Sequence, residues 1–141
     1  MPLRCSRATG NVMRQRQNKE EGISVVQMKL ERIEQGSVTV MRLAGDLDDE
    51  GVKMLRLALL RCIKDRRCNV VVNLAQVGMV SYMALGVLVE RLRQCRMCNG
   101  DLKLVGINLA MEQMFRQAGV SALFEVYESE ANAVHVYQEA A

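Results

Sequence analysis

The sequence predicts one α/β domain in which a mixed β-sheet carries about four helices, in the order β-β-α-β-α-β-α-β-α. Three observations predict this architecture. A half-buried strand pattern opens the regular part of the chain, a continuous β-branched run occupies residues 70–74, and helical apolar spacing recurs between the strand patterns. The length of 141 residues suits a single domain.

Two strands joined by a turn are expected first. Apolar and polar residues alternate over residues 26–31, which is typical of a half-buried strand. Residues 34–36 predict a turn and residues 37–43 a second strand, so that the pair forms a hairpin. Gly45 and the acidic residues around it are expected to end the second strand.

A helix should follow, because the carboxylate of Asp48 or Asp49 can accept hydrogen bonds from its first free N–H groups. Its expected buried face recurs at helical spacing and consists of Val52, Leu55, Leu59 and Cys62. The acidic cluster of Asp46, Asp48 and Asp49 has a metal site as its alternative interpretation, but helix capping already accounts for it.

The run at residues 70–74 predicts a central strand that is covered on both faces. The next helix is predicted from about residue 83 to 96. It should end at Asn99-Gly100, because both residue types tolerate the left-handed conformation of a helix exit. Its expected buried side consists of Ala84, Val87, Leu88, Leu92 and Cys95.

The last elements repeat the alternation of strand and helix. Residues 102–107 predict a strand that leads into a short helix capped by Asn108, and residues 124–127 predict a strand before a final helix capped by Ser129. The short helix should end at Gly119. The residues expected on the buried faces of these two helices are Met111, Met114, Phe115, Ala118, Ala133, Val136 and Tyr137.

The distribution of charge separates a tail from the domain. The formal net charge is +3, and the first 19 residues hold a basic group of Arg4, Arg7, Arg14, Arg16 and Lys19. We expect residues 1–22 to be a disordered basic tail, either solvated or in contact with an acidic partner, and residues 23–141 to form the domain. The remaining chain has no basic stripe, so direct nucleic-acid binding is not expected. No apolar run approaches a membrane span and no signal-peptide core opens the chain, which predicts a cytoplasmic protein.

The five cysteines are an odd number without a secretory signal, which argues against a disulfide framework. Cys95 and Cys98 form a C-x-x-C pattern at the end of a predicted helix, where the helix dipole does not lower a thiol pKa. A zinc site would need a second pair of ligands, and His135 is isolated in the sequence. We therefore expect free thiols, no metal and no cofactor.

The sequence contains none of the common motifs of enzyme active sites. It lacks the phosphate loop, the dinucleotide-binding glycine pattern, the nucleophile elbow and the zinc-protease pattern. A small ligand or nucleotide would be suggested by fold analogy alone. We therefore expect a protein that is not an enzyme.

Residues 79–86 are the most informative segment, because they lie where the central strand gives way to the following helix. A polar interruption at a helix N-terminus is a usual location for a functional site in an α/β domain. This one holds Ser81 and Tyr82 but no acid, base or metal ligand. Ser81 as a helix N-cap is the plain interpretation. A phosphorylation site and a direct partner contact are the alternatives.

The chain resembles the STAS domain family, which contains the bacterial anti-sigma factor antagonists. The resemblance spans about residues 24–138. It is carried by the joint order and spacing of residues 43–48, 70–74, the loop to Gly86, 102–108, 115–120 and 123–129. In such antagonists the loop after the third strand typically reads Asp-Ser-Ser-Gly-Leu-Gly, and the anti-sigma factor, a serine kinase, phosphorylates the serine after the aspartate.

The resemblance, aligned on Leu85-Gly86, puts Ser81 in the position of the family's aspartate and Tyr82 at the usual phosphoacceptor. Met83 takes the place of the second serine, whereas the acid of the neighbouring loop is kept as Asp48. Tyr82 cannot substitute in a serine kinase without moving its hydroxyl several ångströms outward. Ser81 is thus the candidate phosphoacceptor, one residue out of register.

The resemblance implies a non-catalytic bacterial regulator of transcription that binds an anti-sigma factor/serine kinase and releases a sigma factor, here without the usual serine phosphoswitch. The partner-binding residues that it implies are Asp48, Ser81, Tyr82, Met83 and Gly86. The alternative is a small STAS subunit of a larger assembly, such as a lipid-transport ATPase complex or a stress-signalling scaffold. The sequence leaves the oligomeric state open.

Overall fold

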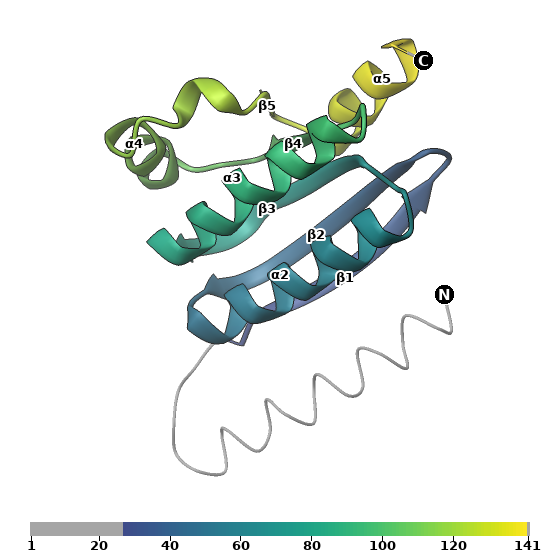
Figure 1. The fold of residues 1–141 in the computed structure, drawn as a ribbon. Coiled ribbons are helices and arrows are strands. Elements are labelled where there is room, and N and C mark those ends of the chain that lie inside the picture. Colours follow the sequence, from purple (N-terminus) through teal and green to yellow (C-terminus); the bar gives the residue numbers. More distant parts are fainter. Residues whose placement is uncertain (1–26, 141) are drawn as a thin grey trace.

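The computed structural model describes residues 27–140, which form a five-stranded sheet with helices on both faces (Figure 1). The strands lie in the order β1-β2-β3-β4-β5, with β1 antiparallel to β2 and the other neighbours parallel. The elements are β1 (Lys29–Gln35), β2 (Val38–Leu47), α2 (Asp49–Lys64), β3 (Asn69–Val80), α3 (Tyr82–Met97), β4 (Asp101–Val105), α4 (Leu109–Gln117), the 3-10 turn η1 (Ser121–Leu123), β5 (Val126–Tyr127) and α5 (Glu130–Ala140). The predicted fold class and element order are confirmed. The predicted tail over residues 1–22 lies outside the described residues.

The two faces of the sheet are covered by different helices. α2, α3 and α4 bury the larger core against one face, which includes Val70 and Val72 of β3. α5 covers the opposite face, where Val71 packs in a smaller core with Ala133 and Val134. Successive residues of a strand point to opposite faces. Burial on both sides therefore explains why the run at residues 70–74 is almost continuously apolar.

Two strands are longer than the sequence indicated. β2 continues through Gly45 to Leu47, and β3 continues past residue 74 to Val80. Gly45 was expected to end β2, but it has a φ of +102°, and the parallel register with β3 shifts around it. A Cβ atom at this position would lie 2.7 Å from the backbone oxygen of Gln27. Glycine at position 45 therefore lets β2 bend where the backbone of Gln27 passes close to it. The pairing of β2 with β3 resumes beyond this point.

Smaller corrections concern the ends of elements and one buried face. The turn of the hairpin is Gly36-Ser37 rather than residues 34–36. The last strand was expected over residues 124–127 but covers only Val126–Tyr127 and is preceded by η1. Ala118 was expected in the core but is exposed, because α4 ends at Gln117 and the chain turns away at Gly119, which has a φ of +75°.

Within residues 27–140 no helix is long and apolar enough to cross a membrane. The same part of the chain holds no group of three or more His, Cys, Asp or Glu side chains that could bind a metal ion. Cys62, Cys68, Cys95 and Cys98 are free thiols, as the sequence indicated.

α5 is joined to the sheet by a buried tyrosine. The Tyr137 hydroxyl donates toward two backbone carbonyl oxygens, at 2.8 Å from Val70 and 2.6 Å from Asp101. These carbonyls belong to the neighbouring strands β3 and β4. A hydroxyl buried at this depth needs such an acceptor, so Tyr137 fixes the position of α5 across the pair of strands.

Replacing Tyr137 by Phe should lower the free energy of unfolding by about 1 kcal/mol, because the hydrogen bond is lost while the ring remains. Urea denaturation would measure the change. Tyr82→Phe is the matched control, since its side chain is 63% exposed, and should leave stability unchanged. Equal stability of Tyr137→Phe and wild type would contradict the role given to this hydroxyl.

An ion pair also anchors the start of α5. Arg42 of β2 donates to both carboxylate oxygens of Glu130 at 2.7 and 2.9 Å, and Asn73 of β3 donates to the same carboxylate at 2.6 Å. The hydrogen bond from Arg42 is the largest cause that holds the pKa of Glu130 below its usual value, against the opposing effect of burial. The charged form of Glu130 is therefore the one that the fold favours.

This pKa shift predicts a loss of stability in acid. A carboxyl group whose folded-state pKa is lowered contributes stability above its unfolded pKa, and the contribution disappears as pH falls through the folded pKa. The difference in unfolding free energy between wild type and Glu130→Gln should therefore shrink as pH falls from 7 to about 3. The lower end of this interval lies below the usual pKa of a carboxyl side chain. Urea denaturation at several pH values would show it, and a difference independent of pH would contradict the assignment.

Candidate functional site

Three helices begin at one edge of the sheet. β2, β3 and β4 are parallel, and each leads directly into a helix on the same face, so the N-termini of α2, α3 and α4 lie where these strands end (Figure 1). We call this side of the molecule the carboxyl edge. It comprises residues 46–51, 78–85 and 108–111. In α/β sheets the carboxyl ends of the parallel strands are the usual location of functional sites.

Each of the three helices has a side-chain cap. The Asp48 carboxylate accepts from the backbone N–H of Gly51 at 2.9 Å, the Ser81 hydroxyl oxygen from Ala84 at 3.2 Å, and the Asn108 amide oxygen from Met111 at 2.8 Å. Capping satisfies N–H groups that have no partner within the helix. The predicted caps at Asp48 and Asn108, and the plain interpretation of Ser81, are confirmed.

The structure brings Asp48 and Ser81 together. Leu47, the last residue of β2, pairs with Val80, the last residue of β3, and the Ser81 backbone N–H donates to the Leu47 carbonyl at 3.0 Å. The caps of α2 and α3 therefore follow two hydrogen-bonded strand ends. Asn108 completes the edge, because its side-chain nitrogen lies 3.5 Å from the carbonyl oxygen of Gly78.

The segment between β3 and α3 is shorter than the sequence indicated. The expectation was a polar interruption after residue 74, but Gln76, Val77 and Val80 are paired with β2, and Ser81 alone separates strand from helix. The extension of β2 beyond Gly45 supplies the partners for this pairing. The predicted loop is therefore a strand-to-helix junction, in which Ser81 is held by backbone and side-chain hydrogen bonds.

Large apolar side chains are exposed around these caps. Tyr82 is 63% exposed, Met83 54% and Met79 45%, and Leu109, directly after the Asn108 cap, is 69% exposed. We call these four residues the apolar patch. Among residues 27–140, the other exposed large hydrophobic side chains lie on other parts of the fold and are Leu57, Met97 and Val126.

The apolar patch includes two residues that the sequence analysis missed. Met79 lies on the strand extension that was not predicted, so its exposure had no signal in the sequence. The exposure of Leu109 did have a signal in the sequence, because an apolar residue directly after an N-cap lies in the first turn of its helix, which no preceding turn covers. Tyr82 and Met83 are exposed where the resemblance placed partner contacts, beside Asp48 and Ser81.

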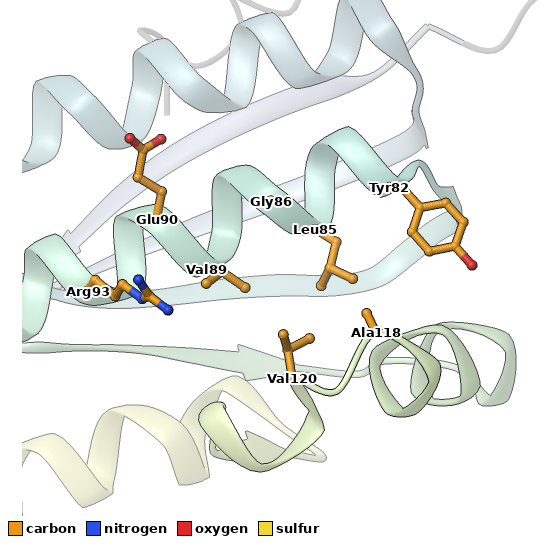
Figure 2. A pocket seen from close by; sticks show the side chains of 8 residues that line it. All are labelled: Tyr82, Leu85, Gly86, Val89, Glu90, Arg93, Ala118 and Val120. Carbon is orange, nitrogen blue, oxygen red and sulfur yellow. The ribbon is translucent and has the colours of Figure 1, made fainter.

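Gly86 lies one helical turn beyond Tyr82 and belongs to a groove. The groove has a volume of about 440 Å³ and runs between α3 and the segment that joins α4 to η1 (Figure 2). A Cβ atom at Gly86 would meet nothing within 4 Å, so its lack of a side chain leaves the groove open rather than relieving a clash. The lining residues are Tyr82, Leu85, Gly86, Val89, Glu90, Arg93, Ala118 and Val120.

The carboxyl edge combines capping polar side chains with exposed apolar ones. Its polar side chains Asp48, Ser81 and Asn108 are used as caps, and its exposed side chains are mainly apolar. Exposed Asp49 and Glu50 add negative charge in the first turn of α2. A surface with an apolar centre and a charged margin is the arrangement typical of protein interfaces.

Comparisons with known proteins identify a family and a fold. The family model of the STAS domain matches residues 29–133. A curated relative, the anti-sigma F factor antagonist of Paenibacillus polymyxa, is 23% identical over 108 residues, which cover 76% of this chain and 92% of the relative.

Two solved structures of the antagonist SpoIIAA have the same fold. The unphosphorylated form superposes with a TM-score of 0.70 at 18% identity, covering 80% of this chain and 97% of SpoIIAA. The phosphorylated form, described as a Bacillus cell fate determinant, gives 0.65 at 20% identity, covering 79% and 99%.

The cap at Ser81 leads to a prediction about stability. Ser81→Ala should lower the unfolding free energy by about 1 kcal/mol, because the first N–H groups of α3 lose their acceptor. Ser81→Asp is the matched variant, since aspartate caps a helix as well as serine does. Its unfolding free energy should stay within a few tenths of a kcal/mol of the wild-type value. Thermal or urea denaturation would compare them. Equal destabilisation by both substitutions would show that the hydroxyl is held for another reason.

Proposed function

We propose that this chain, which belongs to the STAS domain family, regulates transcription by binding an anti-sigma factor/serine kinase through its carboxyl edge and thereby releasing a sigma factor. The domain is of the anti-sigma factor antagonist type, as its relatives are. The observation that supports the proposal most is the apolar patch, to which the first two residues of α3, directly after the Ser81 cap, belong.

The exposure of the patch supports docking. Soluble proteins rarely leave several large apolar side chains exposed side by side unless another molecule covers them. Tyrosine and methionine are also among the residue types enriched at the centres of interfaces. Both Tyr82 and Met83 lie in the first turn of α3, which is held at both its cap and its buried side. The partner would meet a rigid surface and lose little entropy in ordering it.

The charges at the margin indicate the complementary surface. Asp49 and Glu50 lie in the first turn of α2, next to the Asp48 cap. Glu50 is paired only loosely with Lys53, at 3.7 Å, and both are largely exposed. We propose that the partner presents an apolar centre toward Tyr82 and Met83, with basic side chains toward the start of α2.

We further propose that binding is not regulated by serine phosphorylation at the usual place. Tyr82 takes the usual position of the phosphoacceptor, and the Ser81 oxygen already accepts a hydrogen bond from Ala84. A phosphate on Ser81 would add nearly two negative charges beside the Asp48 carboxylate. Such repulsion could eject a partner, but only if the kinase accepts a serine that is displaced by one residue and used as a cap.

Binding should depend on the patch. Isothermal titration of the purified chain with anti-sigma kinases encoded in the same genome should identify one that binds. Tyr82→Ala should then weaken the affinity roughly tenfold, as expected for a central aromatic contact. Met97→Ala is the matched control, because Met97 is 84% exposed at the other end of α3, and should bind as wild type does. Equal affinities of wild type and Tyr82→Ala would remove the patch from the interface.

The absence of the usual switch is tested separately. The chain is incubated with the kinase that it binds and Mg-ATP, and its mass is measured over time. We expect no phosphate at Ser81 or Tyr82, whereas an antagonist with the usual serine should be phosphorylated in the same reaction. Stoichiometric phosphate on either residue would overturn the unswitched version and leave the docking proposal standing.

The result of a purification from cells would distinguish the alternative function. A small STAS subunit of a larger assembly would be recovered in a stable complex with a transport ATPase or in large particles, and would show no affinity for any anti-sigma kinase. That result would overturn the proposed role as an antagonist.

A further inference from the structure

Four thiols gather at the end of the molecule opposite the carboxyl edge. Cys62 lies in the last turn of α2, Cys68 directly precedes β3, and Cys95 and Cys98 are at the end of α3. Cys98 follows Tyr82 by the length of α3, which is about 24 Å for 16 residues. The thiols are therefore remote from the residues to which the proposed function assigns partner binding.

The chain reverses in a tight turn directly after α3, at residues 98–100. The carbonyl of Cys95 accepts from the N–H groups of both Cys98, at 3.0 Å, and Gly100, at 2.8 Å, and Asn99 between them has a φ of +65°. This is the geometry of a tight helix exit that reverses the chain.

The reversed chain packs directly on Cys68. A Cβ atom at Gly100 would lie 2.7 Å from the Cys68 Cβ and 2.1 Å from its carbonyl oxygen, so only glycine fits. The next residue, Asp101, donates its N–H to that carbonyl at 3.0 Å. Cys68 is thus packed against the turn that directly follows Cys98, and the Cys98 thiol contributes to the raised pKa of Cys68.

The thiols differ in their access to solvent. Cys98 is exposed, Cys68 is 8% exposed, and Cys62 and Cys95 are fully buried. Burial is the main cause that raises the pKa of Cys68 to about 11 and that of Cys95 to about 12. The buried thiols therefore stay protonated near neutral pH and react slowly from solution. Cys98 is the thiol that an oxidant meets first.

We propose that Cys98 and Cys68 form a redox-active pair, which a low-molecular-weight disulfide such as oxidised glutathione converts into an intramolecular disulfide. The Cys98 thiolate attacks one sulfur of the oxidant, forming a mixed disulfide and releasing one glutathione thiolate. The Cys68 thiol then loses its proton and attacks the Cys98 sulfur, releasing the second glutathione. The two cysteines together lose two electrons and two protons, and one disulfide of the oxidant becomes two thiols.

The geometry favours Cys68 over Cys95 as the second cysteine. Cys95 belongs to the C-x-x-C pattern, but it has no exposed surface, whereas Cys68 is 8% exposed and packs against the turn that follows Cys98. The resulting bond would tie the end of α3 to the start of β3. It would leave the Ser81 end of the helix unmodified.

Tryptic digestion followed by mass spectrometry can identify which cysteines are joined. Trypsin cleaves after Lys and Arg, which places the cysteines on separate peptides that span residues 5–7, 62–64, 68–91, 94–96 and 97–103. The full chain is incubated with oxidised glutathione at pH 8, its remaining thiols are alkylated, and the digest is analysed by mass spectrometry. We expect peptide 68–91 joined to peptide 97–103, and a native chain lighter by two hydrogens.

Two variants test the assignment. Cys98→Ser changes an exposed residue and should abolish the cross-link, whereas Cys95→Ser should retain it. A cross-link between peptides 94–96 and 97–103 would overturn the pairing. A stable glutathione adduct on Cys98, or no reaction, would overturn the redox pair itself.

A thermal measurement tests whether the disulfide fits the native fold. The cross-link closes a loop of about 30 residues, which restricts the unfolded chain. The oxidised wild type and oxidised Cys95→Ser should therefore melt at a higher temperature than their reduced forms, and reduction with a dithiol should reverse the shift. Cys98→Ser should show none. A lower melting temperature on oxidation would show that the bond strains the fold and would contradict the geometry described.

Discussion

The parallel pairing of β2 with β3 beyond Gly45 is the interaction on which the rest of the site depends. It runs to Leu47 and Val80, so the two strands end together and their helices start side by side. Without this extension, Asp48 and Ser81 would lie on separate loops. With it, the chain turns from strand to helix at Ser81 without a loop, and the first turn of α3 presents Tyr82 and Met83 on a fixed support. The glycine at position 45 makes the extension compatible with the close passage of Gln27.

The two ends of α3 have different chemistry. The N-terminal end is capped, apolar and exposed, which suits a contact with another protein. The C-terminal end packs its turn against the buried Cys68 and carries the exposed Cys98. Because α3 joins both ends, the proposed disulfide would modify the helix that carries the proposed docking surface without touching that surface. The opposite face of the sheet is closed by α5 through Tyr137 and Glu130.

Much of this arrangement could be predicted from the sequence, because the strongest local signals act within a few residues. Asp48, Asn108 and Ser129 have the residue types and positions of helix caps, and each accepts a hydrogen bond from the N–H three residues later. The end of β3 could not be predicted, since Gln76 and Gly78 interrupt the apolar run after position 74, and the pairing of this segment depends on β2, which is distant in sequence. Met79 was missed for the same reason. The proposed pairing of Cys98 with Cys68 also required the fold, because the two cysteines lie 30 positions apart in the sequence.

Hydrogen–deuterium exchange tests most directly whether the carboxyl edge is the docking surface. Amide exchange would be compared for the chain alone and in complex with the anti-sigma kinase that binds it. We expect slower exchange confined to residues 46–51, 78–85 and 108–111, with α5 unchanged. Protection of α5 or of the thiol end, with the carboxyl edge exchanging as in the free chain, would contradict the claim.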